Sequence, residues 1–184
     1  YGSSFPLNRT MTTELLGFDT LSYNVVYAQM GRGKSERIMA QAMSSVAATL
    51  ARLAMDNTMF LNQNFNFISY PAELPTGSSI MPHKKNPDVW ELIRGKCNLI
   101  QGLPNQIAMM TTNLPIGYNR DLQQLKEVLF PAVAELRSCL QMAHYMLENL
   151  SVKEDILNDP KYDYLFSVEV VNDLVLHGTP FRVA

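Results

Sequence analysis

The chain has 184 residues, of which 47% are hydrophobic and 17% are charged. This composition excludes a disordered or collagen-like chain, and the length is sufficient for one domain with a hydrophobic core. The net charge of -2 offers no basic surface to nucleic acid or to an anionic membrane. No apolar run approaches the ~20 residues that a membrane-spanning helix needs. We therefore expect neither nucleic acid nor a membrane as a partner.

The cysteine content and the two ends of the sequence give a second set of expectations. Cys97 and Cys139 are too few for a disulfide framework, so a reducing compartment and a cytoplasmic protein are expected. The sequence starts at Tyr1 rather than at a methionine and stops at Ala184, just after an apolar stretch. We interpret it as a piece of a longer protein.

The first 33 residues are rich in loop-forming residues, and one short helix is expected over residues 10–18 with Thr10 as its N-cap. A long helix is predicted over residues 35–63, with Ser35 as its N-cap. Its larger apolar residues have the spacing of one helical face: Met39, Met43, Val46, Leu50, Leu53 and Met59. The alanines between them would allow neighbouring helices to approach closely.

Residues 64–88 are predicted to be non-helical, because they contain four prolines and a glycine. A helix is expected to start near Pro87, since proline is well tolerated in a first turn. Its apolar stripe comprises Val89, Ile93, Cys97, Ile100, Leu103, Ile107 and Met110. Pro104 lies within this pattern and predicts a kink or a local break.

Another long helix is predicted over residues 120–150, kinked at Pro131. Its apolar seam is nearly a heptad pattern and favours bundle-like packing: Leu122, Leu125, Leu129, Val133, Leu136, Leu140, Ala143 and Leu147. A break over residues 151–159 precedes a last helix over residues 162–177. The fold class is therefore predicted to be all-α, with long helices that need partners beyond one three-helix layer.

The stretch from residue 76 to residue 88 reads TGSSIMPHKKNPD and carries the clearest chemical pattern. Two lysines, an asparagine and a helix N-terminus together favour a bound carboxylate or phosphate. A small hydroxyl beside these cations could be stabilised as an alkoxide and act as a base. From composition alone, a surface turn between two helices is the simpler interpretation.

The pattern GSSIMPxKxNP over residues 77–87 resembles the signature of the fumarase/aspartase superfamily of lyases. Within that superfamily, KKNPD at residues 84–88 with ELIR at residues 91–94 resembles argininosuccinate lyase. The pattern LPxxYNRDLQxxK over residues 114–126 does so as well. The ending GxPFRxA over residues 178–184 resembles the start of that family's C-terminal domain.

This resemblance implies cleavage of argininosuccinate to arginine and fumarate by β-elimination, without a metal or an organic cofactor. It implies catalytic roles for three residues: Ser78 removes the proton next to a carboxylate, Lys84 stabilises the dianionic intermediate, and Glu91 orients a histidine. It implies substrate-binding roles for Arg37, Ser79, Asn86, Tyr118, Gln123 and Lys126. Gln123 and Lys126 are expected on one helical face, with Tyr118 just before that helix. The family often has an aspartate after the residue that matches Arg37, whereas this chain has Ile38.

The resemblance also implies an organisation. Residues 1–150, including the signature loop at residues 76–88, would form part of a central helical bundle, and residues 151–184 would start a C-terminal helical domain. The family forms homotetramers in which each active site draws residues from three subunits. The alternatives are adenylosuccinate lyase or another fumarate-releasing lyase, and a non-catalytic, crystallin-like helical structural protein.

The remaining polar and sulfur residues have simpler interpretations. The spacing of histidines, cysteines and carboxylates predicts no metal site. Cys97 and Cys139 are expected in the core, His144 in packing or at the surface, and His177 at a helix end. His83 occupies a variable position of the signature and is not expected to be catalytic, and neither His144 nor His177 lies in a matching motif. The chain alone is therefore expected to be inactive. The loop at residues 75–86 is expected to be mobile without a ligand.

Overall fold

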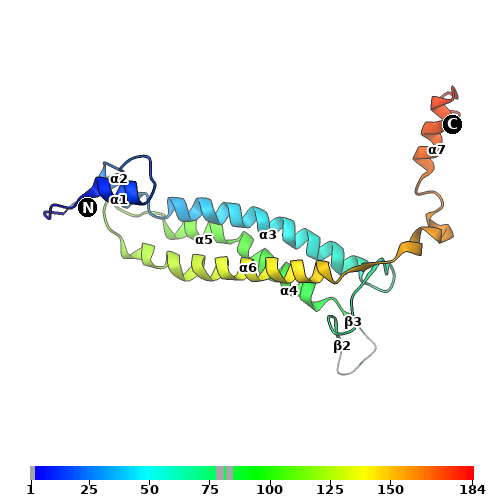
Figure 1. The fold of residues 1–184 in the computed structure, drawn as a ribbon, viewed down its shortest axis with the longest axis horizontal. Coiled ribbons are helices and arrows are strands. Elements are labelled where there is room, and N and C mark those ends of the chain that lie inside the picture. The colour runs from blue at the N-terminus through cyan, green and yellow to red at the C-terminus, as the bar shows by residue number, and fades with distance from the viewer. Residues whose placement is uncertain (1–2, 78–80, 82–84) are drawn as a thin grey trace.

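The computed structural model describes residues 3–77, 81 and 85–184, and it is built around an elongated bundle of helices (Figure 1). The bundle consists of α3 (Lys34–Phe60), α4 (Asp88–Gln101), α5 (Leu103–Met110) and α6 (Leu125–Glu148). Two short helices, α1 (Arg9–Leu15) and α2 (Val25–Met30), lie at one end of it. Helix α7 (Ser167–Leu176) projects beyond the other end. The expected all-α class is confirmed.

The described part of the chain contains four strands of two residues each. They form two short antiparallel ladders that connect loops. β1 (Ile68–Ser69) pairs antiparallel with β4 (Ser151–Val152), and β2 (Thr76–Gly77) pairs antiparallel with β3 (Lys85–Asn86). Three 3₁₀ turns complete the structure: η1 (Arg120–Gln123), η2 (Glu154–Asn158) and η3 (Pro160–Tyr162).

Several helix starts differ from the predicted ones. Thr10 is not the cap of α1, because the Asn8 side chain accepts from the Met11 N–H at 3.0 Å. Ser35 is not the cap of α3, since the helix begins after Gly33, whose N–H donates to the Glu36 carboxylate at 2.7 Å. Helix α2 was not predicted. The last helix begins at residue 167 rather than 162, because two 3₁₀ segments occupy residues 154–158 and 160–162 and turns follow over residues 163–166.

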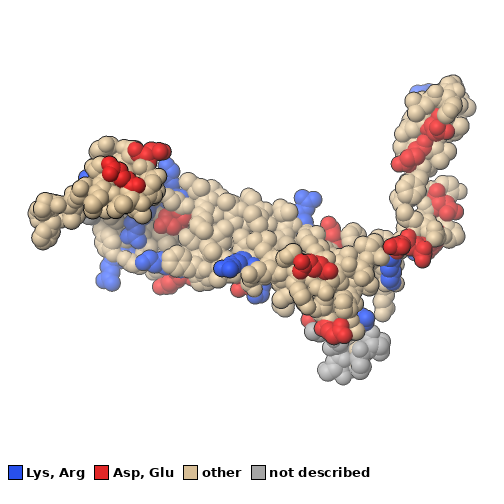
Figure 2. All heavy atoms as spheres, in the orientation of Figure 1, with Lys and Arg blue, Asp and Glu red and all other residues tan. Residues whose placement is uncertain are grey.

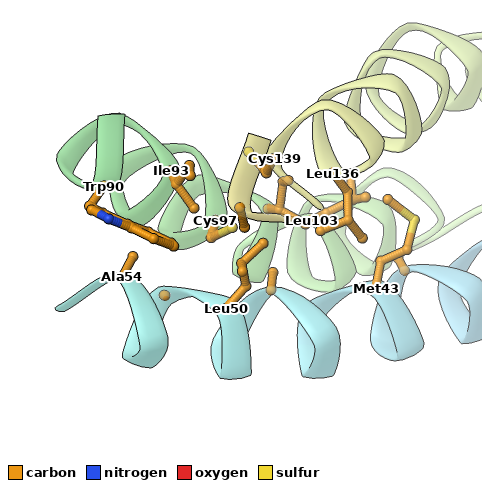
Figure 3. Packing of buried hydrophobic residues seen from close by; sticks show 14 of the residues in the cluster. Met43, Leu50, Ala54, Trp90, Ile93, Cys97, Leu103, Leu136 and Cys139 are labelled. Atoms are coloured by element: carbon orange, nitrogen blue, oxygen red, sulfur yellow. The ribbon is translucent and has the colours of Figure 1, made fainter. Parts of the chain in front are cut away.

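Helix α3 packs through its alanines, as Figure 3 shows for Ala54 below the Trp90 ring. Its buried residues are Ala40, Met43, Ala47, Leu50, Ala51, Ala54 and Asn57. Met39, Val46 and Met59, which were predicted on the packed face, are instead exposed. The small side chains allow α4 to lie close to α3, and the larger Met43 and Leu50 fill the core beside them.

The stripe predicted over residues 89–110 is confirmed at its centre, since Ile93, Cys97, Ile100, Leu103 and Ile107 are all buried. The break predicted from Pro104 is also confirmed: α4 ends at Gln101 with Gly102 as its C-cap, and Pro104 lies in the first turn of α5. There its missing N–H breaks no helical hydrogen bond. Trp90, which the predicted stripe omitted, is fully buried.

Helix α6 continues through Pro131 and buries Leu125, Leu129, Leu136, Cys139, Ala143 and Met146. Three members of the predicted seam, Val133, Leu140 and Leu147, are exposed. They recur every seven residues and form a second apolar stripe, which the described residues leave uncovered. In the view of Figure 2, most of the visible surface of the bundle is uncharged, with a few basic and acidic side chains scattered over it.

By length and composition alone, the stretch Val25–Phe60 could cross a membrane, contrary to the sequence-based expectation. The same test is passed by core helices of helical bundles. Helix α3 makes its most extensive contacts with α4 and also packs on α5 and α6, which identifies it as the central helix of this bundle.

Candidate active site

The structure divides the predicted site residues between the two ends of the bundle. Asn86 and Glu91 lie where α4 begins, whereas Arg37, Tyr118, Gln123 and Lys126 lie where α3 and α6 begin. Thr58, near the end of α3, lines the same groove as Asn86 and Glu91. From Arg37 to Thr58, α3 advances by about 30 Å at 1.5 Å per residue. One copy of the chain therefore does not bring these two groups together.

At the first end, a two-residue ladder holds the base of the signature loop. Thr76 pairs with Asn86, and Gly77 pairs with Lys85. Asn86 is half-buried, and the exposed Glu91 follows in the first turn of α4. Ser78, Ser79 and Lys84, and with them the expected mobility of the loop, lie outside the described residues.

A groove of about 830 Å³ opens beside this ladder. Asn86 and Glu91 line it together with Tyr70, Lys85 and Lys153. Four more amide side chains contribute to its wall: Asn62, Gln63, Asn64 and Asn66. Amide and ammonium donors of this kind suit a ligand that carries carboxylates.

Behind the groove lies a buried hydrogen-bonded chain that the sequence did not reveal. The indole N–H of Trp90 donates to the Tyr70 hydroxyl at 2.9 Å, and that hydroxyl donates to the Asn57 side chain at 3.2 Å. The Asn57 amide donates in turn to the Leu53 carbonyl at 2.9 Å. All three side chains are less than 7% exposed, and burial raises the pKa of Tyr70. These hydrogen bonds fix the segment before the signature loop to α3 and α4.

At the second end, Tyr118 and Gln123 contact each other. The Gln123 amide donates to the Tyr118 hydroxyl at 2.7 Å, and Tyr118 precedes the helical segment as predicted. Gln123 and Lys126 do not share one continuous helix, because Gln123 ends the 3₁₀ turn η1 and Lys126 lies in the first turn of α6. Asn119 and Asp121 in the YNRDLQ stretch favour turns, and an analysis of apolar spacing takes no account of them.

A cavity of about 270 Å³ lies beside this pair, at the junction of α2 and α3 with the loop after α5. Three basic side chains line it, Arg32, Lys34 and Arg37, and none of its described lining residues carries a carboxylate. Gln29 also lines it, and its side-chain nitrogen is buried without an acceptor among the described groups. A bound carboxylate would satisfy that nitrogen and offset the positive charge.

The other chemically capable side chains lie apart from both ends or at the surface. No cluster of three histidine, cysteine, aspartate or glutamate residues occurs among the residues with described positions. His144 and His177 are exposed beside Glu148 and Asp173 respectively. Cys97 and Cys139 are buried in the core as expected, and burial raises the pKa of Cys97 to about 12.

The chain is similar to known lyases. A family profile described as Lyase matches residues 27–102. An argininosuccinate lyase from Parabacteroides distasonis is 64% identical to the chain over all 184 residues, which are 41% of that protein. The argininosuccinate lyase of Aquifex aeolicus is 42% identical over 185 positions, which are 40% of its length. Along its whole length the chain matches argininosuccinate lyases.

Solved structures agree on the fold. A crystal structure of EDDS lyase in complex with formate matches 98% of this chain and 36% of its own, with a TM-score of 0.74 at 23% identity. A fumarate lyase:delta crystallin from Brucella melitensis matches 90% of this chain and 39% of its own, with a TM-score of 0.69 at 19% identity. The chain spans about two fifths of the length of the argininosuccinate lyases that it matches.

Proposed function

We propose that the protein containing this chain is an argininosuccinate lyase, which cleaves argininosuccinate to arginine and fumarate. The single observation that carries this proposal is the 64% identity to an argininosuccinate lyase along the whole chain. The groove beside Asn86 and Glu91 supports it, because its amide and ammonium groups suit the carboxylates of the substrate.

The reaction is a β-elimination, and we assign the roles from the family motif. Ser78 takes a proton from the carbon next to one carboxylate of the succinyl part. The electron pair left behind forms the double bond of fumarate as the bond between carbon and the arginine nitrogen breaks. The nitrogen keeps the electron pair of the broken bond and takes up a proton, which gives arginine. Lys84 and Asn86 stabilise the dianion that develops before this bond breaks, since fixed donors aimed at developing charge give large rate effects. Glu91 orients a histidine.

We assign Arg37, Ser79, Asn86, Tyr118, Gln123 and Lys126 to substrate binding. No metal or organic cofactor takes part in the proposed reaction. We place the protein in the cytoplasm, where Cys97 and Cys139 would stay reduced.

The test is to incubate the full-length protein with argininosuccinate and to measure arginine and fumarate by mass spectrometry. Equal amounts of the two products are expected. Stable argininosuccinate in the presence of folded protein would contradict the proposal.

We further propose that active sites are shared between copies in a homotetramer. Two observations support this: the predicted site residues lie at opposite ends of one bundle, and Val133, Leu140 and Leu147 form an exposed apolar stripe on α6. The test is to mix two full-length variants that are each expected to be inactive, Glu91→Gln and Lys126→Met, under conditions that allow subunits to exchange. Fumarate release by the mixture is expected, because some mixed sites would contain only intact residues. A mixture that stays as inactive as each variant alone would contradict shared sites.

We also propose that residues 1–150 belong to the central bundle domain and that residues 151–184 begin a second helical domain. The apolar side chains of α7 support the boundary, because none of them is buried. Limited proteolysis of the full-length protein should cut first within residues 151–166 if this boundary is correct. Preferred cleavage inside α6 would contradict it.

A further inference from the structure

We propose that Arg32 is a positioning residue, which holds Tyr118 and the turn carrying Gln123 in the arrangement that binds substrate. This inference rests on the proposed function, because it assigns Arg32 a part in that same site. Its basis is a set of contacts between the junction of α2 and α3 and a loop that lies far away in the sequence.

Arg32 contacts this loop region at two points. One guanidinium nitrogen, Nη2, donates to the Leu122 carbonyl at 3.3 Å, in a partly buried position. The guanidinium carbon lies 5.9 Å from the centre of the Tyr118 ring, within range of a cation–π interaction. Leu122 itself is buried, so its carbonyl is a fixed anchor.

Tyr118 links Arg32 to Gln123. Its hydroxyl accepts from the Gln123 amide at 2.7 Å, so that three side chains form one connected series. The Tyr118 side chain is 51% exposed and follows Gly117, whose φ is 123°. An exposed side chain on such a loop loses rotamer freedom when it binds a ligand, and a contact that orders it beforehand lowers this cost.

The backbone at Arg32 is itself held in place. Gly33 adopts a φ of 88°, and a Cβ on it would lie 2.4 Å from the Thr111 methyl group. This close approach is available to glycine alone, and it brings the start of α3 against the end of α5. The Glu36 carboxylate accepts from the Gly33 N–H at 2.7 Å and fixes the same turn. Arg32 is therefore aimed at the Tyr118 loop by a rigid junction.

The test compares Arg32→Met with wild type in the full-length protein, using argininosuccinate as substrate. Methionine keeps an unbranched side chain and removes both the charge and the donors. We expect KM to rise about five- to tenfold while kcat changes less than about twofold, because the lost contacts act on binding rather than on the reacting atoms. Arg32→Lys keeps a cation near the ring and is expected to restore part of this loss. Arg52→Met, an exposed arginine in the middle of α3, is the matched control and should leave KM unchanged.

A double-mutant cycle separates positioning from a general structural effect. In a Tyr118→Leu background, Arg32→Met should change KM less than about twofold, because the side chain through which Arg32 acts is gone. An equal rise in KM in both backgrounds would overturn the proposal. A fall in kcat without a rise in KM would overturn it as well.

A readout without catalysis keeps this test separate from the proposed function. Crystal structures of wild type and Arg32→Met should differ at Tyr118, with the hydrogen bond to Gln123 lost or the ring disordered in the variant. An unchanged Tyr118–Gln123 pair would overturn the role of Arg32 even if the protein acts on another substrate. If wild type left argininosuccinate intact but the ring moved as expected, the proposed function alone would fail.

Discussion

The indole N–H of Trp90 donates to the hydroxyl of Tyr70 at 2.9 Å, and both side chains are more than 90% buried. Trp90 immediately precedes Glu91 on α4, and Tyr70 lies on the segment that leads to the signature loop. This one hydrogen bond therefore holds together the two segments beside the groove, the start of α4 and the segment that leads to the signature loop.

Tyr70→Phe should destabilise the protein. It removes the acceptor for Trp90 and the donor for Asn57, and each buried group left unsatisfied costs about 1–3 kcal/mol. The free energy of unfolding from urea denaturation measures the loss. Tyr23→Phe, at an exposed tyrosine, is the control and should leave the midpoint unchanged. Equal stability of Tyr70→Phe and wild type would show that the buried chain contributes nothing.

Gly33→Ala should destabilise the junction between α3 and α5 by about 1–3 kcal/mol, because it imposes a positive φ on alanine and a clash with Thr111. Adding Thr111→Ser removes the clashing methyl group and keeps the hydroxyl that donates to the Ile107 and Ala108 carbonyls. Thermal unfolding of the double variant should recover part of the loss. No recovery would mean that the backbone angle alone accounts for the effect.

Stability should fall as the pH rises above about 9. Burial raises the pKa of Cys97 from 9.0 to about 12, so in this range the unfolded chain loses a proton that the folded protein retains. Proton loss then favours unfolding, by at most about 1.4 kcal/mol per pH unit for one thiol. Below pH 9 both states hold the proton, and this dependence disappears. Cys97→Ala should flatten the slope of unfolding free energy between pH 9 and 11, and an unchanged slope would contradict the buried thiol.

Ser78→Ala in the full-length protein should lower kcat by about 10²–10⁴-fold with little change in substrate binding, because the lost group transfers a proton. Lys84→Met should damage kcat and KM together, since it contacts a carboxylate before and during the reaction. Steady-state kinetics of Ser79→Ala provides the matched comparison. A severe Ser79→Ala defect with a mild Ser78→Ala defect would show that the wrong serine is assigned.

The 184-residue chain by itself should release no fumarate. Neither His144 nor His177 lines the groove beside Glu91, so neither is placed to be oriented by that carboxylate. Loss of a general acid or base typically costs about 10²–10⁴-fold in rate. Purified chain and argininosuccinate, followed by fumarate absorbance, test this. Appreciable release would show that the histidine implied by the family motif is dispensable.

The periodicity of the sequence predicted the three long helical segments and the break near Pro104, because these depend on local spacing and on proline geometry. On α3 it correctly placed Met43 and Leu50 in the core, but it also put the exposed Met39, Val46 and Met59 on the packed face. Large side chains such as Met39 and Val46 dominate a hydrophobic pattern, but helices pack closely through small ones such as Ala47 and Ala54. Which of two apolar faces is covered depends on tertiary neighbours that a single helix does not specify.

The site shows the same limit. Motifs named Asn86, Glu91, Tyr118 and Gln123, but no spacing revealed that the first two lie at the opposite end of the bundle from the others. Arg32 was missed because its partners are 86 and 90 residues away in the sequence. A glycine on either side of Arg32 was the available signal, since Gly33 marks a turn where the backbone approaches another element.

The proposed function is tested most directly by the ratio of kcat/KM for argininosuccinate to kcat/KM for adenylosuccinate, measured on the full-length protein by fumarate absorbance. Both substrates release fumarate, so the ratio isolates recognition of the leaving group. We expect cleavage of argininosuccinate with a preference of at least about 10³-fold, since a site that hydrogen-bonds one leaving group discriminates strongly against another. Cleavage of adenylosuccinate with argininosuccinate left intact would contradict it.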